Sequence, residues 1–415
     1  MLSFVREVLW SLPTVALLTA VGVYFTVRSR FYQIRGIKHI LTSVRYGGGE
    51  GISPFSALMT ALGGTVGVGS ITGVAYALTA GGAGAVFWMW VTGFFGMMLK
   101  YAEVYMAVLF RKQTPCGYDG SAARVLSAAG KPFAAGLFAV LCVLASLGSG
   151  NLVQAGAVAE AAAEIGIPPL LCAALTAALL APTVFGGQKR IAAVNSAVLP
   201  VFSALLMLFL SAAVILNLRG VPEAFSAIFR EAFGIRQAGA GISGALISIA
   251  LRTGATRGVF SNEAGMGSSP IAHAASPSAD PQKSGDFGVI EVFIDTFLVS
   301  TFCAVALLSG GFATVTEMFS ELFGVIGSVF LTVSLLVFAF ASIISWCFYS
   351  EGCIRFLFGD RRLPRTLYRT LSVAAAFAGC IIPLASVWDA ADIFNALMIV
   401  PNLYALILKR KDISF

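Results

Sequence analysis

Charged residues are scarce in this chain. Asp, Glu, Lys and Arg make up only 11% of its 415 residues, whereas hydrophobic residues make up 58%. An average soluble domain has roughly 25% charged residues. So few charged residues cannot cover the surface of a soluble protein of this size. The composition therefore predicts a helical protein that crosses a lipid bilayer several times.

Groups suited to enzymatic or metal chemistry are also few. The two histidines, His39 and His273, stand in no HExxH spacing and beside no candidate nucleophile. The seven cysteines are scattered without metal-ligand spacing, and most lie in apolar stretches where a free thiol packs as a small apolar side chain. We therefore expect neither an enzyme nor a cofactor.

The net charge of +7 fits membrane topology better than nucleic-acid binding, because the cytoplasmic loops of membrane proteins collect Lys and Arg. If the N-terminus lies outside, most Lys and Arg residues fall on cytoplasmic loops. We therefore predict a multi-pass protein of the cell (inner) membrane with a cytoplasmic C-terminus. Apolar runs long enough to cross about 30 Å of hydrocarbon begin near Ser11, Pro54, Ala83, Pro132, Pro168, Ile191, Gly241, Gly288, Gly324, Ser372 and Ile393.

Two of these spans are interrupted near their middle by glycine and small polar residues. The first reads ALGGTVGVGSITGVA from Ala61 to Ala75, and the second reads RTGATRGVFSNEAGMGSSP from Arg252 to Pro270. Backbone can leave the helix at membrane depth only where protein or a watery cavity satisfies its polar groups. Broken helices at matching positions of two halves are typical of transporters built as inverted repeats around a central site.

Each broken span opens a block of five spans, so the second block must be inverted relative to the first. We predict an all-α polytopic fold of about eleven transmembrane helices. Its parts are an N-terminal extra helix with a cytoplasmic loop (1–50), a first five-helix repeat (51–217), an extracellular loop (218–240), a second five-helix repeat (241–408) and a cytoplasmic tail (409–415).

The first break offers the groups that an amino acid and Na⁺ need. A helix break frees N–H groups for a carboxylate and carbonyl oxygens for a cation. The hydroxyls of Thr65, Ser70 and Thr72 are hard ligands suited to Na⁺. Small residues also serve close helix packing, but the matching second break favours a binding site. The glycines that would let the backbone approach a ligand are Gly63, Gly64, Gly67 and Gly69.

The second break carries Ser261, Asn262 and Glu263 in a glycine-flanked turn, with Arg257 just before them. Charges at membrane depth are costly unless they are paired or face water. Arg257 and Glu263 are therefore expected to form either a gate or a structural pair.

Other spans carry isolated polar groups. Lys100 and Glu103 stand three residues apart, a helical spacing suited to mutual pairing. Gln154 either contacts the substrate or joins two helices, and Asp295 is either a second cation ligand or an acid that pairs helices. On the ninth span, two hydroxyls are candidates to complete a Na⁺ shell and an aromatic ring to cap an apolar pocket: Ser342, Ser345 and Trp346.

Several strings along the chain are long and chemically unusual. They are GGAGAVFWMW from Gly81, GMMLKYAEV, FGGQKRIA, RGVFSNEAGMGSSPIAHAA from Arg257, VFIDTF from Val292 and ADIFNALMIVPN. From about Ser53 to Leu408 they follow the order found in the alanine/glycine:cation symporter family. The chain resembles that family over most of its length.

The resemblance implies a leucine-transporter-like fold of five plus five inverted helices after one extra helix. It also implies Na⁺-coupled uptake of alanine or glycine by alternating access, with a Na⁺ site near the carbonyls of Gly63 and Val66 and the Ser342 hydroxyl. The family usually has Asn where this chain has Ser70, which leaves stoichiometry and substrate preference open. The expected substrate contacts are Gly67, Gly69, Ser70, Thr72, Gln154, Phe260, Ser261, Asn262 and Trp346, with Thr65 and Ser345 added to the Na⁺ shell.

A channel is the main rival, because broken helices also build selectivity filters. Channels usually assemble rings from short subunits, whereas this chain carries both halves of a repeat. Coupling to H⁺, or D-alanine, serine or glutamine as the substrate, stays open within the same family. The sequence does not predict an oligomeric state.

Overall fold

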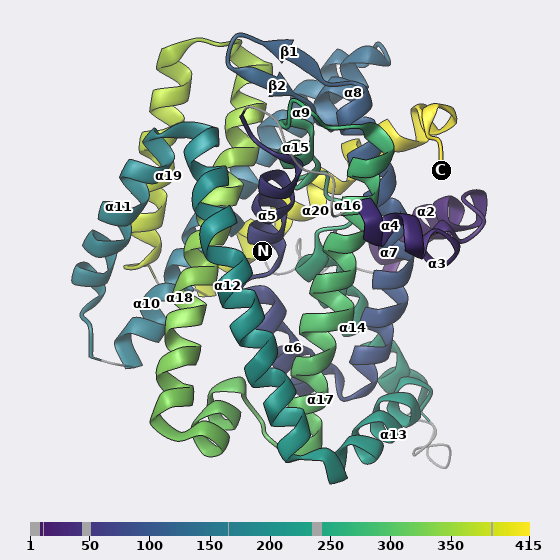
Figure 1. Cartoon of the computed structure of the whole chain (residues 1–415), viewed down its shortest axis with the longest axis vertical. Coiled ribbons are helices and arrows are strands. Elements are labelled where there is room, and N and C mark those ends of the chain that lie inside the picture. Colours follow the sequence, from purple (N-terminus) through teal and green to yellow (C-terminus); the bar gives the residue numbers. More distant parts are fainter. Residues whose placement is uncertain (1–8, 11, 44–50, 165, 235–242, 383–384) are drawn as a thin grey trace.

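The structure is a computed structural model that describes residues 9–10, 12–43, 51–164, 166–234, 243–382 and 385–415. It is nearly all helical (Figure 1), which confirms the all-α expectation. One antiparallel hairpin joins β1 (Lys112–Thr114) to β2 (Gly117–Asp119) at the upper end of Figure 1. The expected span starts at Ser11 and Gly241 lie outside the described residues.

The chain up to residue 232 forms a series of helices joined by short connections. They are α2 (Leu12–Arg28), α3 (Tyr32–Arg35), α4 (Ile37–Ser43), α5 (Pro54–Thr65), α6 (Val68–Gly81), α7 (Gly84–Leu109), α8 (Ala122–Ala128), α9 (Pro132–Ala145), the π-helical η1 (Ser146–Val153), α10 (Gln154–Glu164), α11 (Pro169–Phe185), α12 (Gly187–Leu216), η2 (Leu218–Gly220) and α13 (Val221–Ala232).

The rest of the chain follows a similar plan. Its helices are α14 (Ser243–Asn262), α15 (Pro270–Ala274), α16 (Pro281–Val292), the π-helical η4 (Phe293–Ser300), α17 (Thr301–Gly310), α18 (Val315–Phe358), α19 (Arg362–Gly379), α20 (Ala385–Leu408) and η5 (Arg410–Asp412). Within α18 the backbone turns at Gly324, where φ is 59°, so the long straight part of this helix starts at the predicted position.

Six helical stretches among the described residues are long and apolar enough to cross a membrane. Two shorter apolar helices, Pro13–Arg28 and Pro169–Phe185, accompany them. This agrees with a polytopic membrane protein, while the count of eleven spans stays a prediction. The six are Pro54–Gly81, Pro132–Ala163, Gly187–Leu216, Pro281–Gly310, Val315–Phe358 and Ala390–Leu408.

The outer helices present apolar side chains on their exposed faces. On α12, for example, Val201, Leu208 and Ile215 are each more than half exposed. Seven residues make about two helical turns, so these three residues share one face. Such a face is suited to lipid chains.

Close packing between helices depends on glycine at particular points. A Cβ on Gly254 of α14 would lie 2.1 Å from the carbonyl oxygen of Ala85 on α7. A Cβ on Gly150 of η1 would lie 2.4 Å from the Cβ of Trp346 on α18. At both contacts glycine lets two helices approach closely, as small residues do between membrane helices.

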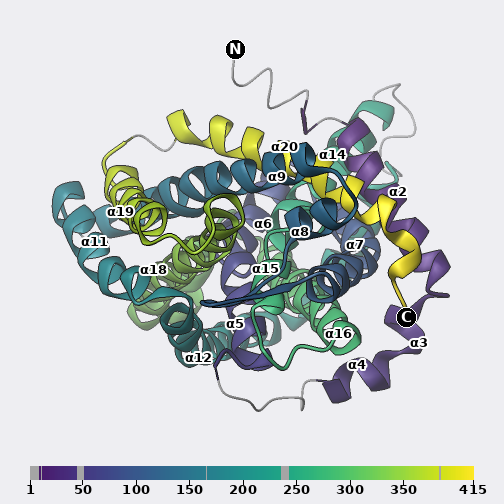
Figure 2. The ribbon, with the colours of Figure 1, turned by 90° about the horizontal axis from the view of Figure 1, so that it is seen from above.

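Both predicted breaks are present. The helix stops at Thr65 and resumes at Val68, and it stops again at Asn262 and resumes at Pro270. In the view from above, α5, α6 and α15 lie near the middle of the molecule, surrounded by the longer helices (Figure 2). The broken helices therefore place their freed backbone groups in the interior.

Candidate functional site

A central cavity lies between the two breaks. The first break lines it with Gly64, Thr65, Gly67 and Gly69, and the second with Phe260, Glu263 and Met266. The elements η1, α10, α18 and α20 complete the wall with Ser149, Gln154, Ser342, Trp346 and Asn395. Thus the two interrupted segments, far apart in the sequence, face one another across one small space.

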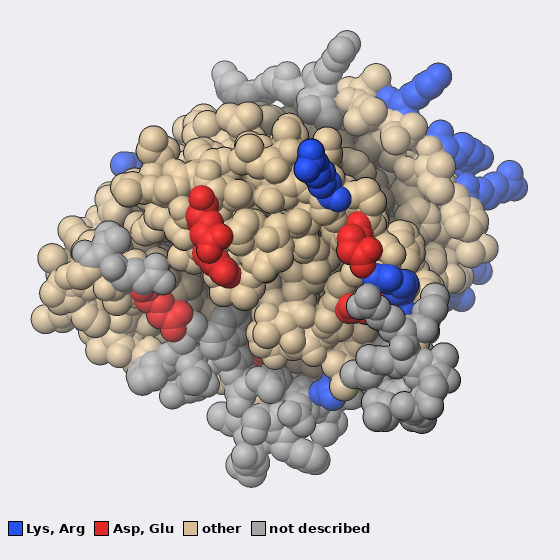
Figure 3. Space-filling model, turned by 90° about the horizontal axis from the view of Figure 1, so that it is seen from below, with Lys and Arg blue, Asp and Glu red and all other residues tan. Residues whose placement is uncertain are grey.

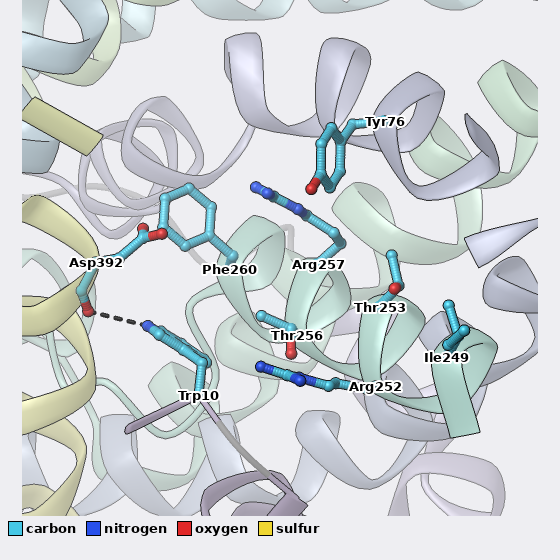
Figure 4. Close-up of a pocket in the computed structure, with 9 residues that line it drawn as sticks. All are labelled: Trp10, Tyr76, Ile249, Arg252, Thr253, Thr256, Arg257, Phe260 and Asp392. Carbon is cyan, nitrogen blue, oxygen red and sulfur yellow. Dashed lines mark hydrogen bonds between the residues drawn. The ribbon is translucent and has the colours of Figure 1, made fainter. Parts of the chain in front are cut away.

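A second cavity of about 290 Å³ adjoins the first, and Figure 4 shows its lining. Arg257 stacks over the ring of Tyr76, with 4.2 Å from Cζ to the ring centroid. Trp10 donates from its indole Nε1 to the carbonyl oxygen of Asp392 at 2.9 Å. Phe260 is the one described residue of this lining that also lines the central cavity.

The first break is joined to α18 through oxygen atoms. Val66 and Gly67 have extended backbone, so carbonyls near the end of α5 lose helical partners. The Ser342 hydroxyl donates to the carbonyl oxygen of Gly63 at 2.9 Å. Ser345 faces the same residue, since a Cβ on Gly63 would lie 2.6 Å from its Oγ. These hard oxygen donors fit Na⁺.

Thr65 lines the central cavity, but its hydroxyl donates back toward the carbonyls of Ala61 and Leu62, each at 3.4 Å. Ser345 accepts a hydrogen bond from Asn195 at 2.9 Å, which fixes its position against α12. Of the five predicted Na⁺ ligands, Gly63 and Ser342 are thus in direct contact.

A polar cluster around Asp295 lies beside the first break. Ser70 donates to its Oδ1 at 2.5 Å, and Ser261 lies 2.9 Å and 2.8 Å from its two oxygens. The Ser70 hydroxyl also lies 3.0 Å from the carbonyl oxygen of Thr65. Asp295 is completely buried. Among the described residues it has no ion pair, so its charge is met by hydroxyl groups alone.

Several predicted substrate contacts lie elsewhere. Ser70 and Ser261 turn toward Asp295, and Asn262 donates to the Thr296 hydroxyl at 3.1 Å. Thr72 lies on the exposed side of α6. Two residues rotate a helix by about 200°, so Thr72 faces away from Ser70. The structure therefore does not place these four side chains in the central cavity.

The expected pairings of charged residues are also corrected. Arg257 and Glu263 form no ion pair in the described structure, because Arg257 stacks on Tyr76 whereas Glu263 accepts from Ser268 at 2.5 Å. Lys100 is paired with Glu291 of α16 at 3.3 Å rather than with Glu103. Arg257 and Lys100 therefore contact residues far away in the sequence instead of the expected neighbours.

Lys100 instead stabilises the second break through hydrogen bonds. Its ammonium group donates to the carbonyl oxygen of Glu263 at 3.1 Å and to the hydroxyl of Ser269 at 2.8 Å. Glu103 accepts from Asn402, whose amide also donates to the Gly265 carbonyl at 2.9 Å. Glu263, Gly265 and Gly267 all have positive φ. The non-helical turn is therefore held by buried charges and amides.

For two residues of the cavity the sequence predicts no clear role. Gln154 has two alternative roles, and Asn395 has none. The Oε1 of Gln154 and the Oδ1 of Asn395 are both buried without a hydrogen-bond partner in the part of the chain that the structure describes. Buried amide oxygens are normally satisfied, so both are free to accept from a ligand. Gln154 follows the π-helical η1 and Asp295 lies within the π-helical η4. Such turns often occur at functional sites.

Known proteins match nearly the whole chain. Residues 1–413 match the model of the sodium:alanine symporter family. A Haemophilus influenzae protein named "Uncharacterized transporter" is 38% identical over 99% of this chain and 94% of its own. "Sodium/alanine symporter AgcS" of Methanococcus maripaludis is 34% identical over 97% and 93%, and "Probable sodium/glutamine symporter GlnT" of Bacillus subtilis is 33% identical over 98% and 87%. The chain belongs to the sodium:alanine symporter family.

Proposed function

We propose that the protein takes up a small neutral amino acid, alanine or glycine, together with Na⁺, by alternating access around the central cavity. The observation that carries this proposal is the meeting of the two helix breaks at one small, partly polar space. The names of two relatives, which refer to sodium with alanine and with glutamine, support the choice of ion and substrate class.

The arrangement of helices supports an inverted repeat. Each half opens with an interrupted helix, α5 and α6 in the first and α14 and α15 in the second. We propose the leucine-transporter-like plan of five plus five helices after one extra helix. The divisions at residues 50, 217, 240 and 408 remain part of this proposal.

We infer the orientation of the protein in the membrane from the distribution of its Lys and Arg residues. The hairpin, α8 and the C-terminus lie at one end of the molecule (Figure 1), where many Lys and Arg residues occur. The opposite end is mostly uncharged, with scattered acidic and basic side chains (Figure 3). Because Lys and Arg collect on the cytoplasmic side, we place the C-terminus in the cytoplasm and the N-terminus outside.

The free energy released when one Na⁺ enters is sufficient to drive accumulation of the substrate. An ion moving down about 100 mV releases roughly 2.3 kcal/mol, and a tenfold gradient adds about 1.4 kcal/mol. Together these would concentrate a neutral solute on the order of several hundredfold. A single Na⁺ near Gly63 and Ser342 would therefore support accumulation.

Ser342→Ala is expected to raise the Na⁺ concentration needed for half-maximal alanine uptake about tenfold, because it removes an oxygen donor beside the Gly63 carbonyl. Uptake into proteoliposomes at graded Na⁺ checks this. Ser334→Ala is the matched control, since Ser334 is a buried serine of the same helix whose hydroxyl has no partner among the described residues. Equal Na⁺ dependence of both variants would exclude Ser342 as a ligand.

Gln154→Ala is expected to weaken alanine binding about tenfold and Na⁺ binding less than twofold. The reason is the unpartnered Oε1 in the central cavity, which is placed to accept from a substrate ammonium group. Calorimetry on purified protein measures both affinities. Gln188→Ala is the control, because that buried amide donates to the Phe348 carbonyl instead. Parallel loss of both affinities would mean that Gln154 only joins helices.

A further inference from the structure

A separate cavity of about 630 Å³ lies at the end of the molecule that carries the hairpin. Its wall combines the hairpin, the residues preceding α5, the start of α12, the end of α18 and the start of α19. None of its lining residues lines the central cavity. It is therefore a distinct space, and its chemistry can be considered by itself.

The cavity carries an excess of positive charge. Among the residues that the structure describes, Glu351 is the one acidic side chain in the lining, and it already accepts two hydrogen bonds from Arg369, at 3.1 Å and 2.6 Å. Arg365 donates to backbone carbonyls and to the Cys116 sulfur, which are neutral acceptors. The basic residues of the lining are Lys189, Arg355, Arg365 and Arg369.

Arg355 distinguishes this cavity from an ordinary basic surface. It lies one helical turn after Glu351 on α18 and is only 4% exposed, and its Nε is buried with no acceptor in the described structure. It has no ion pair among the described residues. The carboxylate of Asp119 on β2 is bound through its Oδ2 by Arg124, at 3.0 Å and 2.5 Å. Exposed cations need no counterion, but a buried guanidinium without one is costly.

We propose that this cavity binds a small oxyanion, a phosphate or carboxylate group, through Arg355 and Lys189. A guanidinium presents a planar fork of N–H donors that matches the oxygens of such a group, and a nearby ammonium adds a point charge. The group can come from free phosphate, from the headgroup of an anionic lipid, or from a carboxylic acid. The site does not depend on the proposed transport function.

The test uses purified full-length protein without any transport measurement. Its thermal unfolding is followed with inorganic phosphate or propionate against chloride at equal ionic strength, and in nanodiscs of phosphatidylglycerol against phosphatidylcholine. The variants are Arg355→Gln and Lys189→Gln. Arg190→Gln is the matched control, because it removes an equal charge from the exposed residue next to Lys189 that does not line the cavity.

We expect at least one of the three anions to raise the unfolding temperature of the wild-type protein and of Arg190→Gln by several degrees. Both cavity variants should lose most of this shift, and the anion that produces it identifies the source. Lys189→Gln keeps the test decisive if Arg355→Gln does not fold, since Lys189 is exposed. No shift with any of the anions, or an equal shift in Lys189→Gln and Arg190→Gln, would overturn the proposal.

Discussion

Gly69→Leu is expected to abolish amino-acid uptake while leaving the protein folded. Gly69 lies near the start of α6 and lines the central cavity. The nearest atom to an added Cβ is Cδ1 of Phe260 at 4.0 Å, so the first atom of a new side chain makes no close contact. A leucine would extend into the space proposed for the substrate. We expect uptake to fall at least about a hundredfold, because the added side chain excludes the ligand from the cavity.

Gly73→Leu provides the matched control. This glycine lies one turn further along the same helix, and an added Cβ would meet nothing within 4 Å. Both variants should elute as the wild-type protein does in gel filtration, and Gly73→Leu should retain most of its uptake into proteoliposomes. Substantial uptake by Gly69→Leu would show that the substrate does not bind between the two breaks.

Asp295→Asn is expected to reduce Na⁺ affinity at least about a hundredfold, or about 2.7 kcal/mol. Asp295 is completely buried and contacts the hydroxyls of Ser70 and Ser261, which are neutral. An isolated buried carboxylate is costly unless a cation or a proton balances it. We propose that Na⁺ does so, with Asp295 as a second cation ligand. Amide substitution preserves the shape of the side chain but removes its charge.

The control for this variant is Asp286→Asn. Asp286 is also fully buried on the preceding part of the same helix, but its partners are Tyr32, His39 and Ser43, none of which belongs to either break. Sodium binding measured by calorimetry should be unchanged in this control. Wild-type Na⁺ affinity in Asp295→Asn would instead show that Asp295 only pairs helices. Uptake driven by a pH gradient in the wild-type protein would favour a proton in its place.

The two breaks could be predicted from the sequence because their cause is local. Runs of glycine and small polar residues weaken a helix wherever they occur, and at membrane depth such backbone must lie in the interior. The turn at Gly324 is also local, since its φ of 59° favours glycine. These features needed no knowledge of tertiary contacts.

The direction of individual side chains could not be predicted in the same way. Ser70 was assigned to the substrate, but the burial of a carboxylate on η4 turns it toward Asp295 instead. Lys100 has Glu103 at a suitable helical spacing, yet its partner Glu291 is far away in the sequence. Asn395 was missed because only the packing of α20 brings it to the cavity. Helix rotation and packing decide these contacts.

The central claim is Na⁺-coupled uptake, and it is tested most directly in proteoliposomes that contain the purified protein. Labelled alanine and glycine are supplied under an inward Na⁺ gradient and, separately, under an equal K⁺ gradient. We predict accumulation above the external concentration with Na⁺ only, and its collapse when the gradient is dissipated. Equal uptake in Na⁺ and K⁺ that never exceeds the external concentration would contradict coupled transport and favour a channel.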